Sequence, residues 1–369
     1  MSNAGPPPRR SRRAQMPMMF MAALALLAAL WAGLLRLGWA IPPLGANLMG
    51  NHGPLMINGF LGTVISLERA VALGRNQGGR RRYMIVPLLA GLSGVALLLG
   101  LPPMVARGLS VAAAVGLVYI FVVIYRWQPG VDHGVMGLAA VLWLVGNALW
   151  LAGWSVPRVV PWWAGFLILT IAGERLELAR VLLLKRGARE MFIAAVAVFT
   201  VGLVISLAVP DIGIRVAGAG LVFLGLWLLR YDIARITIRR EGLTRFIAAC
   251  LLPGYFWLLV GGGLWLYFGA SYSAGLIYDA QYHALLLGFV ISMIFGHAPV
   301  IIPAVMGVAV PYRPVFYVHL VLLHLSLVLR VYGDLMLNWE ARRWGGLLNE
   351  VAVVLFLVVT IVSARMGKK

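Results

Sequence analysis

The sequence has few charged residues, and the acidic ones are the scarcest. Only 12% of its 369 residues are charged, with 12 Asp and Glu against 31 Lys and Arg, whereas about 25% of the residues of an ordinary soluble domain are charged. A chain that is 62% hydrophobic cannot cover its core with a polar shell in water. We therefore expect an integral membrane protein that lies in a lipid bilayer.

Cysteine is almost absent as well. The single Cys250 excludes an internal disulfide, a cysteine-ligated iron–sulfur cluster and a cysteine zinc site. No glycine-rich phosphate loop is evident, because the glycine run 261–263 lies inside an apolar stretch, where it favours close helix packing. No Ser/His/Asp nucleophile arrangement is evident either.

The basic excess has the distribution of membrane loops. The net charge of +19 lies largely in clusters between apolar stretches, such as 9–13, 80–82 and 185–189. Such clusters are typical of loops held on the cytoplasmic side. They predict a bacterial-type inner (plasma) membrane protein with both termini in the cytoplasm, and no nucleic acid as partner.

Twelve stretches are long and apolar enough to cross a bilayer, which takes about 20 residues per helix. They are roughly 18–40, 52–73, 84–101, 104–125, 134–154, 161–184, 191–209, 213–231, 245–269, 277–304, 314–333 and 345–365. We expect an all-α protein with a disordered cytoplasmic tail, 1–17, and one polytopic membrane domain, 18–369. The predicted outer loop with Arg342 and Arg343 departs from the charge rule.

Three of these stretches share a landmark, a Gly-Phe pair followed by a polar residue nine positions after the glycine. The three sets are Gly59-Phe60 with Glu68, Gly165-Phe166 with Glu174, and Gly288-Phe289 with His297. They lie four spans apart, which predicts three pseudo-repeats of four helices, about 18–130, 131–244 and 245–369. Units with an even number of spans lie parallel, unlike the inverted repeats of many transporters.

Two histidines stand close to this landmark. His52 lies seven residues before Gly59, and His283 lies five residues before Gly288. Two residues of helix rise by about 3 Å, so both imidazoles are expected at one depth near the outer face. Ionisable residues inside membrane helices are candidate functional groups. Two facing histidines could ligate a haem iron from both sides.

His297 belongs to a different depth. It lies 14 residues after His283, about 21 Å farther along the helix, at the level of Glu68 and Glu174. Two interpretations remain open for these three residues. They could form a proton-handling or metal-binding cluster, or the glutamates could pair with nearby arginines, which is the interpretation we favour.

The other histidines carry weaker expectations. His319 and His324 are five residues apart, which turns a helix by about 140°, so they should point to different faces. His133 is expected to be solvated at the cytoplasmic end of its span.

Two segments resemble the catalytic subunit of haem–copper oxidases. "HGPLMINGF", 52–60, resembles its second helix, where a His-Gly-x-x-Met-Ile pattern supplies a low-spin haem ligand. "DAQYHALLLGF", 279–289, resembles its tenth helix, and His283 matches the histidine that completes that site. Arg342 and Arg343 resemble the arginine pair that holds the haem propionates. The resemblance implies a haem–copper-oxidase-like bundle and a haem, of b-type, with His52 and His283 as ligands.

The sequence also departs from that family. Gln281 replaces the high-spin haem ligand, the sixth span lacks a His-x-x-x-Tyr pattern and the seventh lacks a His-His pair. Oxygen reduction is therefore not expected, and copper is left open without a clear motif to hold it. "YHALLLGF", 282–289, is more similar to the NnrS family, twelve-span relatives of the oxidases linked to nitric oxide stress.

The sequence thus favours a haem-binding, NnrS-like membrane protein with a bis-histidine haem. It would act in electron transfer or in a nitric oxide or redox stress response, with the lipid bilayer, haem and either nitric oxide or a redox partner as partners. Whether it is an enzyme is left open. The alternative is a transporter or channel with an intramembrane path of Glu68, Glu174 and His297.

Overall fold

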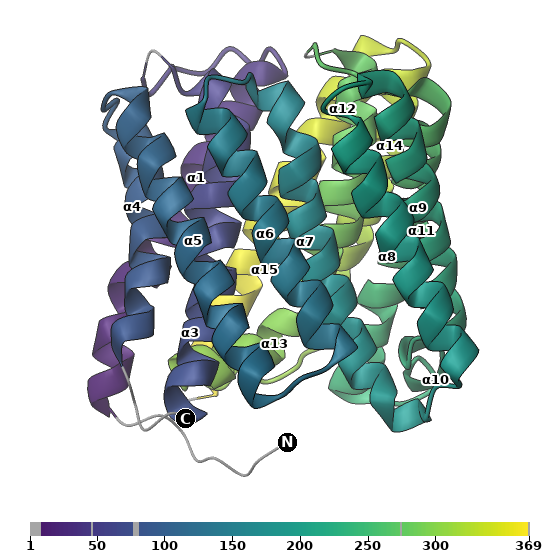
Figure 1. The fold of residues 1–369 in the computed structure, drawn as a ribbon. Coiled ribbons are helices and arrows are strands. Elements are labelled where there is room, and N and C mark those ends of the chain that lie inside the picture. Colours follow the sequence, from purple (N-terminus) through teal and green to yellow (C-terminus); the bar gives the residue numbers. More distant parts are fainter. Residues whose placement is uncertain (1–8, 46, 77–80, 274, 368–369) are drawn as a thin grey trace.

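The protein is a bundle of helices that run side by side along one direction (Figure 1). The computed structural model describes residues 9–45, 47–76, 81–273 and 275–367, and within these residues no strand occurs. Twelve helical segments in this part of the chain are long and apolar enough to cross a membrane. The prediction of an all-α, twelve-span membrane protein is confirmed, and the chain is a multi-pass membrane protein.

The elements follow one another with short connections, and several spans consist of more than one element. In chain order they are α1 (Arg9–Arg36), η1 (Met49–Asn51), α2 (His52–Pro54), η2 (Leu55–Gly62), α3 (Thr63–Asn76), η3 (Arg81–Met84), α4 (Ile85–Leu98), α5 (Pro103–Trp127), α6 (Val131–Leu151), α7 (Val156–Ala179), η4 (Arg180–Leu182), α8 (Arg186–Ile205), α9 (Pro210–Tyr231), α10 (Ala234–Thr237), α11 (Gly242–Phe268), α12 (Leu276–His283), η5 (Ala284–Ile291), α13 (Ser292–Met306), α14 (Phe316–Leu335) and α15 (Trp339–Met366).

Two boundaries differ from the sequence prediction. Helix α1 begins at Arg9, inside the segment predicted as a disordered tail, while residues 1–8 lie outside the described residues. Helix α15 begins at Trp339, so Arg342 and Arg343 belong to its first turns and not to a loop. The Asn338 side chain caps this helix by accepting a hydrogen bond of 3.0 Å from the Ala341 amide. Hydropathy alone misses such a start, because the first turns are polar.

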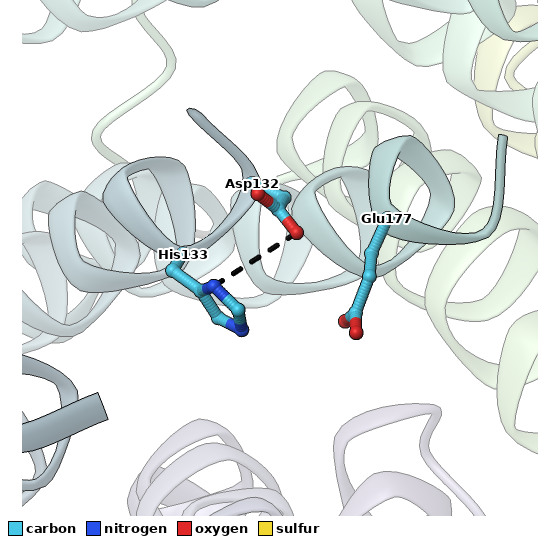
Figure 2. Close-up of side chains that lie close together, drawn as sticks. All are labelled: Asp132, His133 and Glu177. Carbon is cyan, nitrogen blue, oxygen red and sulfur yellow. Dashed lines mark ion pairs between the residues drawn. The ribbon is translucent and has the colours of Figure 1, made fainter. Parts of the chain in front are cut away.

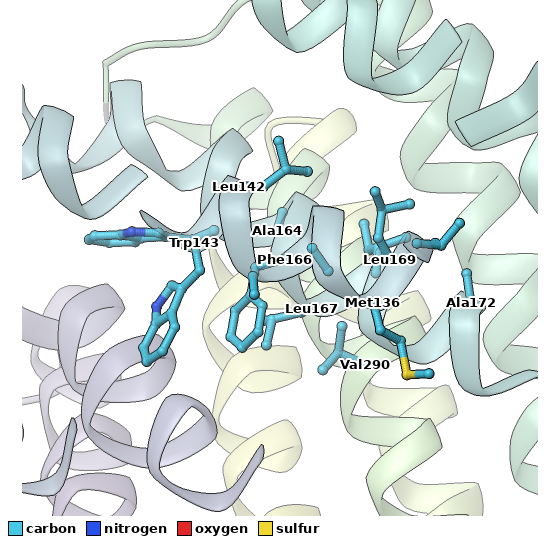
Figure 3. Packing of buried hydrophobic residues seen from close by; sticks show 14 of the residues in the cluster. Met136, Leu142, Trp143, Ala164, Phe166, Leu167, Leu169, Ala172 and Val290 are labelled. Carbon is cyan, nitrogen blue, oxygen red and sulfur yellow. The ribbon is translucent and has the colours of Figure 1, made fainter. Parts of the chain in front are cut away.

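The sixth span, α7, forms the centre of the bundle. In its most apolar stretch of 18 residues, 78% is buried, which is the highest share among the twelve spans. Its Phe166 ring stacks on Trp143 of α6 with ring centres 4.9 Å apart, and Val290 of η5 joins the same apolar cluster (Figure 3). Because α7 touches neighbours on every side, it has few positions at which a polar group could be solvated.

The second and tenth spans share an irregularity that α7 lacks. Each contains an eight-residue π-helical segment, η2 in one and η5 in the other. The Gly-Phe pair occupies the fifth and sixth positions of both segments. π-helical turns are rare and occur frequently at functional sites.

The three landmark glycines also pack in a similar way. A Cβ on Gly59 would lie 2.9 Å from the Ala25 Cβ of α1, and one on Gly165 would lie 2.8 Å from a Leu142 methyl group of α6. Gly288 lies against Trp257 of α11 in the same manner. Each glycine therefore contacts the first helix of its own predicted four-helix unit. This agrees with the predicted pseudo-repeat, which stays a prediction.

Candidate functional site

The two histidines predicted to meet do lie close together in the structure. His52 begins α2 and His283 ends α12, and their ring centroids are 6.3 Å apart with the planes inclined by 32°. Helix α12 lies at one end of the bundle, and α10 and α13 lie at the other (Figure 1). We call the end with His52 and His283 the histidine end.

Backbone carbonyls hold both imidazoles in place. Nδ1 of His52 lies 2.8 Å from the Ala29 carbonyl oxygen, and Nδ1 of His283 lies 2.9 Å from that of Asp279. A carbonyl oxygen only accepts hydrogen bonds, so Nδ1 is the donor in both rings. In each neutral ring the lone pair is then on Nε2, for which no described residue provides a hydrogen bond. Nδ1 anchored in this way is typical of a histidine that ligates a metal through its other nitrogen.

The two rings border a cavity of about 90 Å³, which we call the histidine cavity. This volume is below the roughly 300–1,000 Å³ of small-molecule sites, so a larger ligand requires the side chains of the wall to move apart. Most of its wall is apolar, including Val156 and Val160 of α7. The polar groups of the wall besides the histidines are Arg36, Tyr278, Tyr282, Arg330, Asn349 and Glu350.

A buried ionic network supports one of the rings. Arg330 binds Asp279 through two hydrogen bonds, of 2.7 Å from Nε and 2.9 Å from Nη2. The Oδ1 atom of this carboxylate is 3.3 Å from Nδ1 of His283. Arg342 extends the network, with Nε 2.9 Å from Oδ1 of Asp334. The carboxylate of Asp279 therefore stabilises positive charge on the His283 ring, while Arg330 fixes its position.

The comparison with known families adds one finding. A family model described as "Domain of unknown function (DUF8744)" matches residues 15–365. The chain belongs to this family. No curated protein matches it. This family description names no activity, so a function has to be argued from the site itself.

The arginine pair predicted for haem propionates is not among the described residues of the cavity wall, although Nη2 of Arg342 is 3.7 Å from Oδ1 of Asp279. Arg342 pairs with Asp334 and stacks over Trp339 at 4.8 Å, and Arg343 stacks over Trp39 at 4.1 Å. The arginines of the wall are Arg36 and Arg330, which the sequence analysis did not single out. A usable signal existed for Arg330, since a charged residue inside an apolar span is expected to have a partner.

The second predicted cluster consists of ion pairs. Arg69 contacts Glu68 at 3.8 Å and forms a hydrogen-bonded ion pair with Glu174. The favoured interpretation, in which the glutamates pair with nearby arginines, is therefore confirmed for Glu68 and Glu174. His297 accepts a 3.4 Å contact at Nε2 from Arg175, whose main partner is Asp232 at 2.8 and 2.9 Å. The sequence analysis missed Asp232.

The remaining histidines have distinct surroundings. His319 is buried among phenylalanine rings, including Phe295 at 4.8 Å. His324 accepts a 3.1 Å hydrogen bond from Trp257 and lies 3.3 Å from the Ser292 hydroxyl. Both rings contact residues of α11 and α13, so the prediction that they point to different faces stays a prediction. The expectation of a solvated His133 is wrong, because it is only 7% exposed.

Proposed function

We propose that this protein binds a haem between His52 and His283 and carries electrons through it. The observation that carries this proposal is the 6.3 Å separation of the two ring centroids. A metal–imidazole bond is about 2.0–2.1 Å long and the ring centre lies roughly 1.2 Å behind the nitrogen, so two rings that share one iron have centroids about 6.4 Å apart. The two distances agree.

The hydrogen bonds of the rings support the same assignment. Both Nδ1 atoms donate to backbone carbonyls, which leaves Nε2 available as the ligand atom. Gly33 keeps space beside one ring, because a Cβ there would lie 3.4 Å from Cε1 of His52 and 2.5 Å from Oε1 of Glu350. The residues present therefore fit a haem iron with two axial imidazoles.

The cavity wall suits the rest of such a group. Its apolar part matches a porphyrin face, and the guanidinium groups of Arg36 and Arg330 are positioned as partners for propionates. Arg36 is the freer of the two, since its one hydrogen bond, to the Met49 carbonyl, is 3.4 Å long. Arg330 is engaged by Asp279. We therefore assign the propionate-binding role first to Arg36.

The arrangement favours electron transfer over gas chemistry. A bound haem would supply one-electron redox chemistry, and His52 and His283 would both hold its iron. The Asp279 carboxylate beside His283 stabilises the oxidised, more positive state, while Arg330 limits this effect through its opposite charge. His52 is the less firmly held of the two rings, since the Ala29 carbonyl is its one hydrogen-bond partner among the described residues, whereas His283 contacts both the carbonyl and the carboxylate of Asp279.

We also propose the orientation and the compartment. An even number of spans puts both termini at one end of the bundle, opposite the histidine end. The basic clusters in the sequence assign the end with the termini to the cytoplasm. The histidine cavity then opens toward the outer face of a bacterial-type inner membrane, where a redox partner would reach it.

Visible absorption spectra of the purified full-length protein test the proposal. Expressed with haem supplied, it should show a Soret band with about one haem per chain and sharp low-spin bands on reduction. A colourless protein that also fails to take up added hemin would overturn the proposal. The alternative, a transporter or channel, predicts such a protein together with substrate flux in liposomes, although Glu68 and Glu174 are paired with Arg69.

A further inference from the structure

Three potential metal-ligating side chains converge at the end of the bundle opposite the histidine end. Asp132 and His133 lie in the first turn of α6, and Glu177 lies in the last turn of α7. One ligand atom from each lies within 4.8 Å of the other two, and no other such group of three occurs in the described part of the chain. In Figure 2 the three side chains surround one space, with the Glu177 carboxylate across from the imidazole.

Two polar atoms of this group are buried without a hydrogen-bond partner. They are Oδ2 of Asp132 and Nδ1 of His133. Their residues are 1% and 7% exposed, and the two atoms are 4.0 Å apart. This distance is too long for a hydrogen bond. Buried polar atoms rarely stay unpaired, so the geometry calls for a group that binds both atoms.

The close approach of α6 and α7 builds this site. Gly173 lies one helical turn before Glu177, and a Cβ on it would come within 3.0 Å of the Asp132 carbonyl oxygen and 2.6 Å of Cγ of Met136. Glycine at this position lets the last turn of α7 lie directly against the first turn of α6. Residues 45 positions apart in the sequence thereby become neighbours.

The local charge favours a cation. Arg180 forms a hydrogen-bonded ion pair with Oδ1 of Asp132, which leaves Oδ2 free, and the described residues provide no ion-pair partner for Glu177. The two carboxylates of the group share one directly paired guanidinium, that of Arg180, while Arg69 acts on Glu177 from a longer distance. The Arg180 side chain is 54% exposed, so solvent can stabilise it when a further cation arrives.

The buried imidazole also borders a groove at the surface of the bundle. This groove, of about 350 Å³, lies between α5 and α6 and includes His133 in its wall, together with Phe121 and Tyr125 of α5. Access of this kind is needed for an ion to exchange at a site whose ligands are otherwise covered.

We infer that Asp132, His133 and Glu177 bind a divalent first-row transition metal ion, such as Zn²⁺ or Mn²⁺. One imidazole nitrogen and two carboxylate oxygens suit these ions. Cu(I) prefers sulfur ligands, and Mg²⁺ and Ca²⁺ prefer oxygen alone. Ligand atoms around a tetrahedral ion lie about 3.4 Å apart, so side-chain rotations of about 1 Å close the group around it. The ion ties the start of α6 to the end of α7 and keeps a coordination position for water.

Metal analysis of the full-length protein tests this inference independently of any haem. The protein is purified in detergent without a histidine tag, stripped with a chelator, equilibrated with ZnCl₂ and desalted. We expect one Zn²⁺ per chain by mass spectrometry, and an absorption band of bound Co²⁺ in a parallel titration. His133→Gln and Glu177→Gln should each weaken Zn²⁺ binding at least about tenfold.

Two controls make the result specific. Glu190→Gln removes an exposed carboxylate that pairs only with Arg186, and it should leave the affinity for Zn²⁺ unchanged. His283→Ala removes a histidine of the other cavity and should also leave the Zn²⁺ content unchanged. A loss of Zn²⁺ in His283→Ala, with retention in His133→Gln, would assign the ion to the histidine cavity and overturn the inference.

Glu177→Gln protects the test against misfolding, because this side chain is half-buried and no ion pair of the described residues depends on it. Zn²⁺ should raise the thermal unfolding midpoint of the unmodified protein, since it binds only the folded state, and the rise should be lost in Glu177→Gln. Equal Zn²⁺ affinity in the unmodified protein and in this variant, or no Zn²⁺ retention by the unmodified protein, would refute the site.

Discussion

The second and tenth spans carry histidines at the cavity, whereas α7, in the equivalent place of the middle unit, carries valine. Five residues before the landmark glycine stand His283 in the tenth span and Val160 in α7, and both line the histidine cavity. Seven residues before it stand His52 in the second span and Arg158 in α7, which stacks on Trp154 at 4.4 Å instead. Two of the three spans thus place an imidazole at the cavity, and the third places an apolar side chain there.

The backbone winding also distinguishes the two histidine-bearing spans from α7. The histidine-bearing spans change from α- to π-helical winding within three residues after their histidines, while α7 stays a regular helix and is the most buried span. A regular helix packs most efficiently, and a π-helical segment leaves some backbone groups without their usual partners. Irregular winding thus occurs in the spans whose histidines border the cavity, and regular winding occurs in α7, which serves packing.

The largest expected effect is the loss of haem when a ligand is removed. His283→Ala or His52→Ala should lower the haem content of the purified protein at least about tenfold, or convert its low-spin spectrum to high-spin, because one strong axial ligand is lost. Val160→Ala, at the matching position of α7, should keep the haem and its low-spin spectrum. Equal losses in His283→Ala and Val160→Ala would remove the distinction between the two kinds of span.

The next effect separates a buried ion pair at the cavity from one at the opposite end. Asp279→Asn leaves Arg330 unpaired, and Asp232→Asn does the same to Arg175, so each should lower the free energy of unfolding by about 3–5 kcal/mol. Thermal unfolding followed by circular dichroism would measure both. Only Asp279→Asn should also raise the midpoint potential in a redox titration, since only this carboxylate lies beside His283. A similar shift in Asp232→Asn would contradict the proposed role of Asp279.

A smaller effect concerns the landmark glycines. Gly59→Ala places its Cβ against backbone, 3.1 Å from Cα of Gly94, and should destabilise the protein by about 1–3 kcal/mol. Gly165→Ala meets the ends of leucine side chains, 2.8 Å from Leu142 and 3.1 Å from Leu203, which can rotate away, so it should cost under about 1.5 kcal/mol. The unfolding midpoints of the two variants give the comparison. A larger destabilisation by Gly165→Ala than by Gly59→Ala would show that the span with the π-helical segment accepts an added Cβ more easily.

The smallest effect distinguishes the arginines of the cavity wall from those predicted by resemblance. Arg36→Gln should weaken hemin binding about two- to fivefold, as expected for a largely exposed ion pair. Arg343→Gln should leave it unchanged, because this side chain stacks on Trp39 away from the wall. Hemin titration of protein prepared without haem measures both affinities. Weaker binding in Arg343→Gln alone would favour the arginine pair that the resemblance to the oxidases implies.

Much of the fold could be predicted from the sequence, but less of the candidate sites. Hydropathy located all twelve spans, while the polar start of α15 escaped it. The shared register found His52 and His283. It could not find Asp279 with Arg330, because these residues are 51 positions apart and their contact depends on how two spans pack. His133 was taken as solvated because it lies at the cytoplasmic end of its span, but it is buried close to Glu177 of α7.

By itself the sequence determined the number of spans and the depth of the polar groups, because helix length and rise follow directly from the order of residues. Only the tertiary structure decided which groups meet. His52 and His283 differ by two positions relative to the landmark, about 200° of regular helix, yet their ring centroids lie 6.3 Å apart. The direction of a side chain depends on helix rotation and on local π-helical winding, and packing against neighbouring helices sets both. The same packing, and not proximity along the chain, brings Glu177 to Asp132 and His133.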